Sequence, residues 1–196
     1  MGVLMAPIRK ELIMNREMIT KYEHSLKCAI KGLYGDEGLA ESLIKGVIKK
    51  ADFYELPCDI SEKYKVEGGL LEYTLDVYEN LMAKALNPVW KQTFDAKKIT
   101  GDDMAFVALT HSFSKMFTLK KDENGNFINY DSFCVGKGQE RAVILLTSKG
   151  FKMNCEQIYA IRWCDFIKDR EIDYDLIGKY PLILALAEAV MEVTIK

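Results

Sequence analysis

The chain has 196 residues and a mass of 22.4 kDa, the length of one domain. It holds 27 Lys and Arg against 29 Asp and Glu, a formal net charge of −2, so no whole-protein field attracts nucleic acid and we do not expect it as a partner. A hydrophobic share of 49% with only four Pro excludes disordered, collagen-like and low-complexity classes. We therefore expect a single globular domain over residues 1–196.

The cysteine pattern and the hydropathy point to a reduced, cytoplasmic protein. Five Cys make an odd number with no CxxC spacing, so neither a disulfide framework nor a zinc ribbon is encoded. Reduced thiols are typical of the cytoplasm. No stretch approaches the ~18 to 20 apolar residues that span a bilayer, and the start lacks the apolar core of a signal peptide, so we expect no membrane partner.

Apolar residues recur at helical spacing through most of the chain, which predicts a mainly α fold. Asp102 or Asp103 can cap one helix, Asn154 and Gln157 form a capping-box pattern, and Pro88 ends a helix. The predicted helices cover residues 10–33, 38–50, 68–86, 104–116, 138–149, 154–166 and 181–196. The first two form an N-terminal section, 1–55, and residues 57–67 are expected to be a loop.

Two local backbone features are also encoded. Gly68 and Gly69 permit a tight entry into a helix, and GGLLEY matches no phosphate-binding loop, so we expect these glycines to serve the backbone only. The Asn124-Gly125 pair favours a turn between residues 117–120 and 127–130, which predicts a small β-hairpin.

Five segments, in order, carry a resemblance to a known family. They are GGLLEYTLDVYENL (68–81), VALTHSFSKM (107–116), YDSFCVGKGQERAVILL (130–146), EQIYAIRWCDF (156–166) and PLILALAEAVMEVT (181–194). Their order, spacing and intervening hairpin resemble the histidine-aspartate (HD) domain superfamily of metal-dependent phosphohydrolases, especially its short phage-type members. The resemblance covers 68–194 and implies an HD-domain-like helical bundle.

The chain departs from the family's metal-binding pattern in its first two segments. The family reads GGLLEHTL where this chain has Tyr73 in place of the ligating His. The His-Asp doublet that names the family is represented by His111 and Ser112, and the Lys that follows the doublet is retained as Lys115. One carboxylate and one imidazole are therefore replaced.

The later segments show the same departure. The family's GHGEKS is GKGQER here, which places Lys137 where a His stands. The family's AIRWH ends in Cys164 in this chain, while Arg162 and Trp163 remain. The Asp of the last helix aligns with Val190, half a turn from Glu188.

Ligand counting gives the functional expectation. A divalent cation needs several oxygen or nitrogen ligands in fixed geometry, and His111 alone does not supply them. We therefore expect no bound metal, no cofactor and no catalytic residue. Lys137, Lys115 and Arg162 make the position cationic and suited to phosphate, while Tyr73 and Trp163 offer aromatic surfaces for a base.

The sequence thus predicts a catalytically inactive binder of a phosphate-containing small molecule, a nucleotide, with Ser112 and Cys164 also at the site. The phage-type resemblance implies, as one concrete form, a viral protein that sequesters a host nucleotide signal. Two other functions stay open: a phosphohydrolase or nuclease with non-standard ligands, and a structural or protein-interaction module, which includes a homo-oligomer formed through the N-terminal helices.

Purely structural roles for the same residues stay open as well. His111 can be a hydrogen-bonded core histidine, and Cys164 a small buried hydrophobe. Lys137 can be a solvated loop residue, and Arg162 can serve a structural ion pair.

Overall fold

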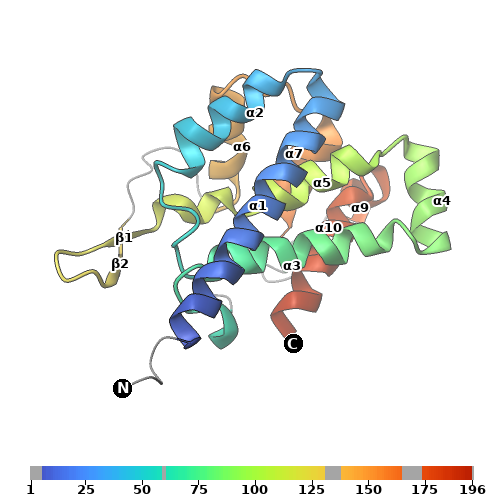
Figure 1. Cartoon of the computed structure of the whole chain (residues 1–196). Coiled ribbons are helices and arrows are strands. Elements are labelled where there is room, and N and C mark those ends of the chain that lie inside the picture. The colour runs from blue at the N-terminus through green and yellow to red at the C-terminus, as the bar shows by residue number, and fades with distance from the viewer. Residues whose placement is uncertain (1–5, 59–60, 131–137, 165–173, 196) are drawn as a thin grey trace.

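The computed structural model describes residues 6–58, 61–130, 138–164 and 174–195, which form a mainly helical fold with one β-hairpin (Figure 1). The predicted fold class is confirmed. Lys137 and residues 165–166 of the predicted sixth helix lie outside the described residues. Within the described ranges, no helix combines the length and apolar character that crossing a bilayer requires.

The bounds of the elements are as follows. The α-helices are α1 (Ala6–Tyr34), α2 (Glu37–Leu43), α3 (Gly69–Lys84), α4 (Pro88–Lys97), α5 (Gly101–Thr110), α6 (Glu140–Ser148), α7 (Cys155–Trp163), α9 (Tyr174–Lys179) and α10 (Leu182–Ile195). A π-helical turn η1 (Ile44–Ile48), two 3₁₀ segments η2 (Glu62–Tyr64) and η3 (His111–Phe117), and antiparallel strands β1 (Leu119–Lys121) and β2 (Phe127–Asn129) complete the fold.

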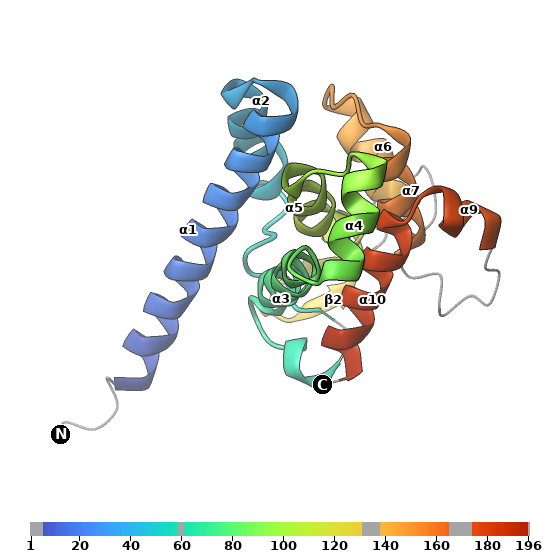
Figure 2. The same cartoon turned by 90° about the vertical axis from the view of Figure 1, so that its right-hand side faces the viewer.

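Helix α5 lies at the centre of the bundle. Figure 2 shows α1 on one side, α3 and α5 in the middle, and α7 and α10 on the other side. Every residue of α5 from Asp103 to Thr110 is buried, as expected for a helix covered on all faces. A second, smaller apolar cluster forms around Ile183 and Ala187 of α10, against which α7 and α9 pack.

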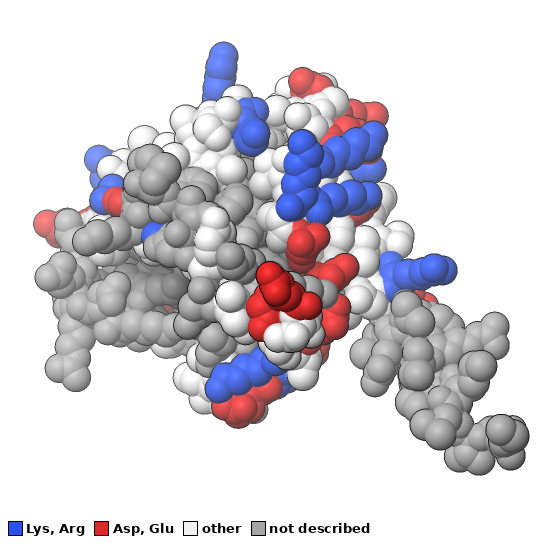
Figure 3. Space-filling model, turned by 90° about the vertical axis from the view of Figure 1, so that its left-hand side faces the viewer, with Lys and Arg blue, Asp and Glu red and all other residues white. Residues whose placement is uncertain are grey.

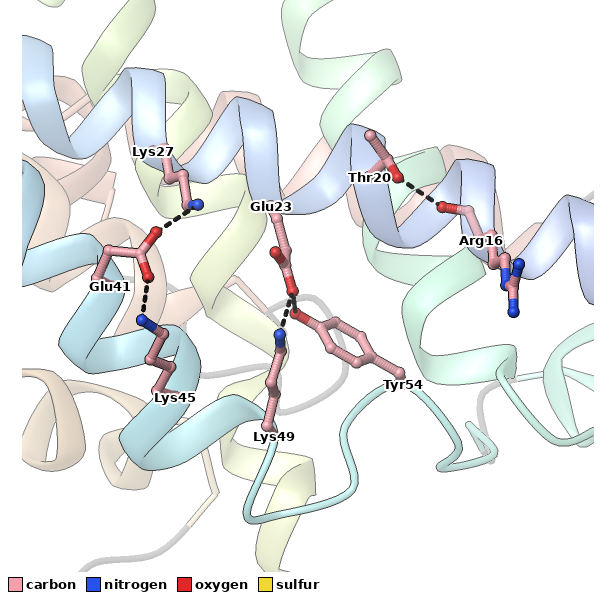
Figure 4. Close-up of polar contacts among 8 residues, drawn as sticks. All are labelled: Arg16, Thr20, Glu23, Lys27, Glu41, Lys45, Lys49 and Tyr54. Atoms are coloured by element: carbon pink, nitrogen blue, oxygen red, sulfur yellow. Dashed lines mark hydrogen bonds and ion pairs between the residues drawn. The ribbon is translucent and has the colours of Figure 1, made fainter.

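Helix α1 packs through one stripe and is tied to the following helices by charged side chains. Tyr22, Leu26 and Ile30 recur every four residues and are fully buried. At the edge of this packing, the Glu41 carboxylate lies 2.5 Å from Lys27 Nζ (Figure 4). The Tyr54 hydroxyl donates a 2.8 Å hydrogen bond to the Glu23 carboxylate, and burial together with this bond raises the pKa of Tyr54.

The surface view agrees with a near-neutral chain. On the face drawn in Figure 3, basic and acidic side chains lie next to one another. Ion pairs on exposed surfaces contribute little each, so the apolar stripe of α1 supplies most of its attachment.

Several predicted boundaries are wrong for identifiable reasons. The sequence does not predict helix α4, because Asn87 and Pro88 indicate only the end of the preceding helix. Asn87 Oδ1 accepts from Val89 N at 2.9 Å, and Pro88 takes the first helical position, so the same residues also start α4. The helix predicted over 104–116 changes to 3₁₀ geometry at His111.

The hairpin prediction is confirmed, with strands shorter than expected. Its loop contains three residues, 123–125, closed by the Asp122 N to Asn126 O hydrogen bond of 2.8 Å. Gly125 has φ 82°, the left-handed conformation that ends such a loop. The Asp122 carboxylate accepts from the backbone of Asn124 and Asn126, which lowers the pKa of Asp122.

The two glycines at the start of α3 serve the backbone, as predicted. Gly68 has φ 81°, and a Cβ on Gly69 would lie 1.9 Å from the Tyr64 carbonyl oxygen. This close approach lets η2 pack directly against the start of α3.

We predict that Gly69→Ala destabilises the protein by roughly 1 to 3 kcal/mol, because the added methyl group displaces the Tyr64 backbone. The matched control is Gly46→Ala, where nothing lies within 4 Å of the new Cβ. Urea unfolding measures both; equal free energies of unfolding for the two variants would contradict the prediction.

Asp103 joins the first turns of α5 and α7. Its Oδ2 accepts from Thr100 N at 2.8 Å and Thr100 Oγ1 at 2.6 Å, and Asp103 N donates back to Thr100 Oγ1. Its Oδ1 accepts from Gln157 Nε2 at 2.9 Å and Asn154 Nδ2 at 3.3 Å, the two side chains of the predicted capping box of α7. The expectation that Asp102 or Asp103 occupies the N-cap of α5 is wrong: Thr100 does.

We predict that Asp103→Ala lowers the free energy of unfolding by about 3 kcal/mol, because it removes one capping box and leaves the buried Gln157 amide without an acceptor. Asp102→Ala, in the same helical turn, is the control and should change stability by less than about 1 kcal/mol. Thermal and urea unfolding measure both; a similar loss in the control would show that Asp103 has no special role.

Candidate functional site

Tyr73 of α3 and His111, the first residue of η3, form the centre of the predicted site. The His111 Nδ1 atom lies 2.7 Å from the Ala108 carbonyl oxygen and its Nε2 lies 3.3 Å from the Tyr73 hydroxyl oxygen. A carbonyl oxygen only accepts, so Nδ1 carries a proton, and in the neutral form of the ring Nε2 accepts from the Tyr73 hydroxyl. Each side chain belongs to a residue with 1% exposure.

The next residue on each element, Thr74 of α3 and Ser112 of η3, forms a second hydrogen bond between the two elements. Thr74 donates its single hydroxyl proton to Leu70 O at 2.7 Å, so Ser112 is the donor in the 2.7 Å bond between Ser112 Oγ and Thr74 Oγ1. Both hydroxyls are fully buried. The first and second segments of the family resemblance are therefore adjacent in space at two consecutive positions.

The second segment also meets the third. The Ser114 hydroxyl donates a 2.7 Å hydrogen bond to Gln139 Oε1, which holds the residues before α6 against η3. Lys115 follows Ser114 and is half-buried. Ser114, the neighbour of Lys115 in the sequence, thus contacts the GKGQER motif, whose Lys137 lies outside the described residues.

Arg162 and Trp163 lie at the end of α7, where Arg162 faces Glu140 of α6. Arg162 Nη2 is 2.5 Å from Glu140 Oε1, and its guanidinium carbon lies 5.8 Å from the centre of the Trp163 ring. Trp163 is half-buried and packs on the apolar cluster of Ile183 and Ala187. Arg162 thus takes part in the ion pair that the sequence left open as a structural role.

The remaining candidates are buried or paired. Cys164 has 1% exposure and Val190 has 3%. Glu188 forms a 3.1 Å ion pair with Lys84, whose side chain is 10% exposed. The fifth segment is therefore tied to α3 by charge, while the position aligned with the family's last Asp is part of the apolar core.

One contributor was missed by sequence reasoning. Tyr64 of η2 packs edge-on against Tyr73, with ring centres 5.6 Å apart, and its hydroxyl donates to Asp76 Oδ2 at 2.6 Å. Burial and the Asp76 carboxylate raise the pKa of Tyr64 to about 12. No spacing signal marks Tyr64, because it lies in a loop region and reaches the site only through the close approach at Gly69.

The described residues contain no group of three or more His, Cys, Asp or Glu side chains placed to hold a metal ion. Comparison of the chain with protein-family models, curated proteins and solved structures finds no match. The candidate site therefore depends on its own geometry and on the order of its motifs.

We predict that the double variant Tyr73→His with Ser112→Asp binds Mn²⁺ or Ni²⁺, because it adds an imidazole and a carboxylate to His111. At a metal concentration about 100 times the Kd, binding adds ~2.7 kcal/mol to stability, a rise in Tm of roughly 5 to 10 °C for a chain of this size.

The wild type and Tyr73→His alone are the controls and should show smaller metal-dependent shifts. A folded double variant whose Tm is insensitive to both metals would show that the three positions do not converge as a ligand set.

Proposed function

We propose that this protein is a catalytically inactive HD-fold protein that binds a phosphate-containing small molecule, a nucleotide, without hydrolysing it. The observation that carries the proposal is the hydrogen bond from the Tyr73 hydroxyl to His111 Nε2. This bond supports the alignment of Tyr73 with the family's ligating His. The Tyr73 phenol hydroxyl is bonded to the Nε2 lone pair that a metal ion would otherwise bind.

The geometry of His111 supports the loss of turnover. Its Nδ1 proton goes to a backbone carbonyl, the arrangement that usually orients a metal-ligating imidazole. Its Nε2 is engaged by Tyr73, and Ser112 has no carboxylate to bring to an ion. In this proposal the ring is a fixed structural element beneath the ligand.

Positive charge supplies the affinity. Lys115 is half-buried and directly follows Ser114, which contacts Gln139 of the GKGQER motif, and an ammonium group forms charge-assisted hydrogen bonds with phosphate. Lys137 is proposed as the second cation. Arg162 keeps N–H donors beyond the one that faces Glu140, so it can bind a phosphate oxygen without losing its ion pair.

The aromatic contributions are divided by burial. Tyr73, with 1% exposure, is part of the buried floor of the proposed site. Trp163 is half-buried, so its ring has accessible surface on which a base can stack. Binding without turnover means sequestration or sensing. The capture of a host nucleotide signal by a viral protein is the form that the phage-type resemblance favours.

The test is nucleotide binding by calorimetry, with mass spectrometry of small molecules released from denatured protein. We expect a bound nucleotide whose affinity falls about tenfold or more in Lys115→Glu and in Lys137→Glu, because each variant replaces a charge-assisted bond to phosphate by repulsion. Lys149→Glu, an exposed residue at the end of α6, is the matched charge control and should bind normally.

Two results would contradict the proposal. Unchanged affinity in both lysine variants would remove this site, and metal-dependent nucleotide turnover that His111→Ala abolishes would instead identify an active phosphohydrolase.

A further inference from the structure

His24 and Cys28 form an exposed pair on α1, away from the candidate site. They are four residues apart, so their side chains lie one above the other on the same face of the helix. His24 Nε2 lies 3.7 Å from Cys28 Sγ. Both residues are exposed, and neither side chain contributes to the core of α1.

We propose that His24 and Cys28 bind a zinc ion as a bidentate surface site. With Zn–N of about 2.0 Å and Zn–S of about 2.3 Å, a tetrahedral ion holds its two ligand atoms about 3.5 Å apart. The observed 3.7 Å separation is within a few tenths of an ångström of this value, so both atoms reach the ion without a change in the helix.

The chemistry of the pair selects the metal. An imidazole nitrogen and a thiolate are borderline and soft ligands, which favour zinc over calcium or magnesium. The described residues offer no third metal-ligating side chain there, so two positions remain for water. The ion is therefore labile and open to an additional ligand.

The surrounding charges tolerate a cation. Two lysines of the same stretch of α1 are engaged with carboxylates: Lys27 Nζ lies 2.5 Å from Glu41, and Lys31 Nζ lies 2.5 Å from Glu37. The hydrogen bond from Lys31 lowers the pKa of Glu37, so this carboxylate stays ionised and keeps its pair with Lys31. The positive charge of each lysine is thus compensated locally.

The test measures how fast iodoacetamide alkylates Cys28 in the reduced full-length protein, with and without zinc, followed by peptide mass spectrometry. Because a zinc-bound thiolate is a poor nucleophile, we expect zinc to slow alkylation of Cys28 about tenfold. His24→Ala should remove this protection, and it leaves the exposed helix intact because Ala is a good helix former.

Cys155, the other exposed thiol among the described cysteines, is the internal control and should react at the same rate with and without zinc. As a second measurement, Co²⁺ should give thiolate-to-cobalt absorption that both His24→Ala and Cys28→Ser abolish and Cys155→Ser retains. Failure of zinc to slow alkylation of Cys28, or equal protection in His24→Ala, would overturn the proposal. The nucleotide-binding proposal uses none of these residues, so the two can fail separately.

Discussion

The carboxylate of Asp103 is the interaction on which the arrangement of the helices depends. One oxygen completes the capping box of α5, and the other accepts from the two side chains that cap α7, so two helices that are distant in sequence begin at one buried group. The two bonds from Asn154 and Gln157 to the second oxygen fix the relative direction of the helices, because both are lost if either helix shifts. Since α5 leads to His111, and α7 ends at Arg162 and Trp163, the same carboxylate fixes the starts of the two helices that carry these residues relative to each other.

The polar centre formed by Tyr73, His111, Ser112 and Thr74 is held together by hydrogen bonds between buried side chains. Fixing the His111 tautomer through a backbone carbonyl is useful when Nε2 must present a lone pair. Here the lone pair meets the Tyr73 hydroxyl, and Ser112 donates to Thr74 instead of presenting a carboxylate. A buried polar group needs a partner to avoid a desolvation cost, and the Tyr73 and Ser112 hydroxyls each supply one without a buried charge of their own. The polar centre is therefore stable as it stands, and the charges that remain, such as Lys115, lie nearer the surface.

Local signals in the sequence predicted most of the fold. The capping box at Asn154 and Gln157, the Asn-Gly hairpin and the backbone role of Gly68 and Gly69 depend on residues a few positions apart, and the structure confirms each. Helix α4 was missed because Asn87 and Pro88 both end one helix and start the next. The candidate site shows the same limit. The order of the segments predicted that Tyr73 and His111 lie at one site. The contact between Tyr64 and Asp76 depends on how a loop packs against α3, and the spacing of residues in the sequence does not indicate such packing. The cap of α5 was misplaced because an Asp at the third helical position resembles an N-cap until Thr100 is considered.

The small apolar cluster around Ile183 and Ala187 has a consequence for motion. It is separate from the main core, and side chains of α7 and α9 that are only half-buried cover it. Segments with little buried apolar area open with a lower free energy than the whole molecule does. Helix α9 can therefore open as a local unit while α1, α3, α5 and α7 stay packed, and amide protons in α9 should exchange with solvent well before those of α5.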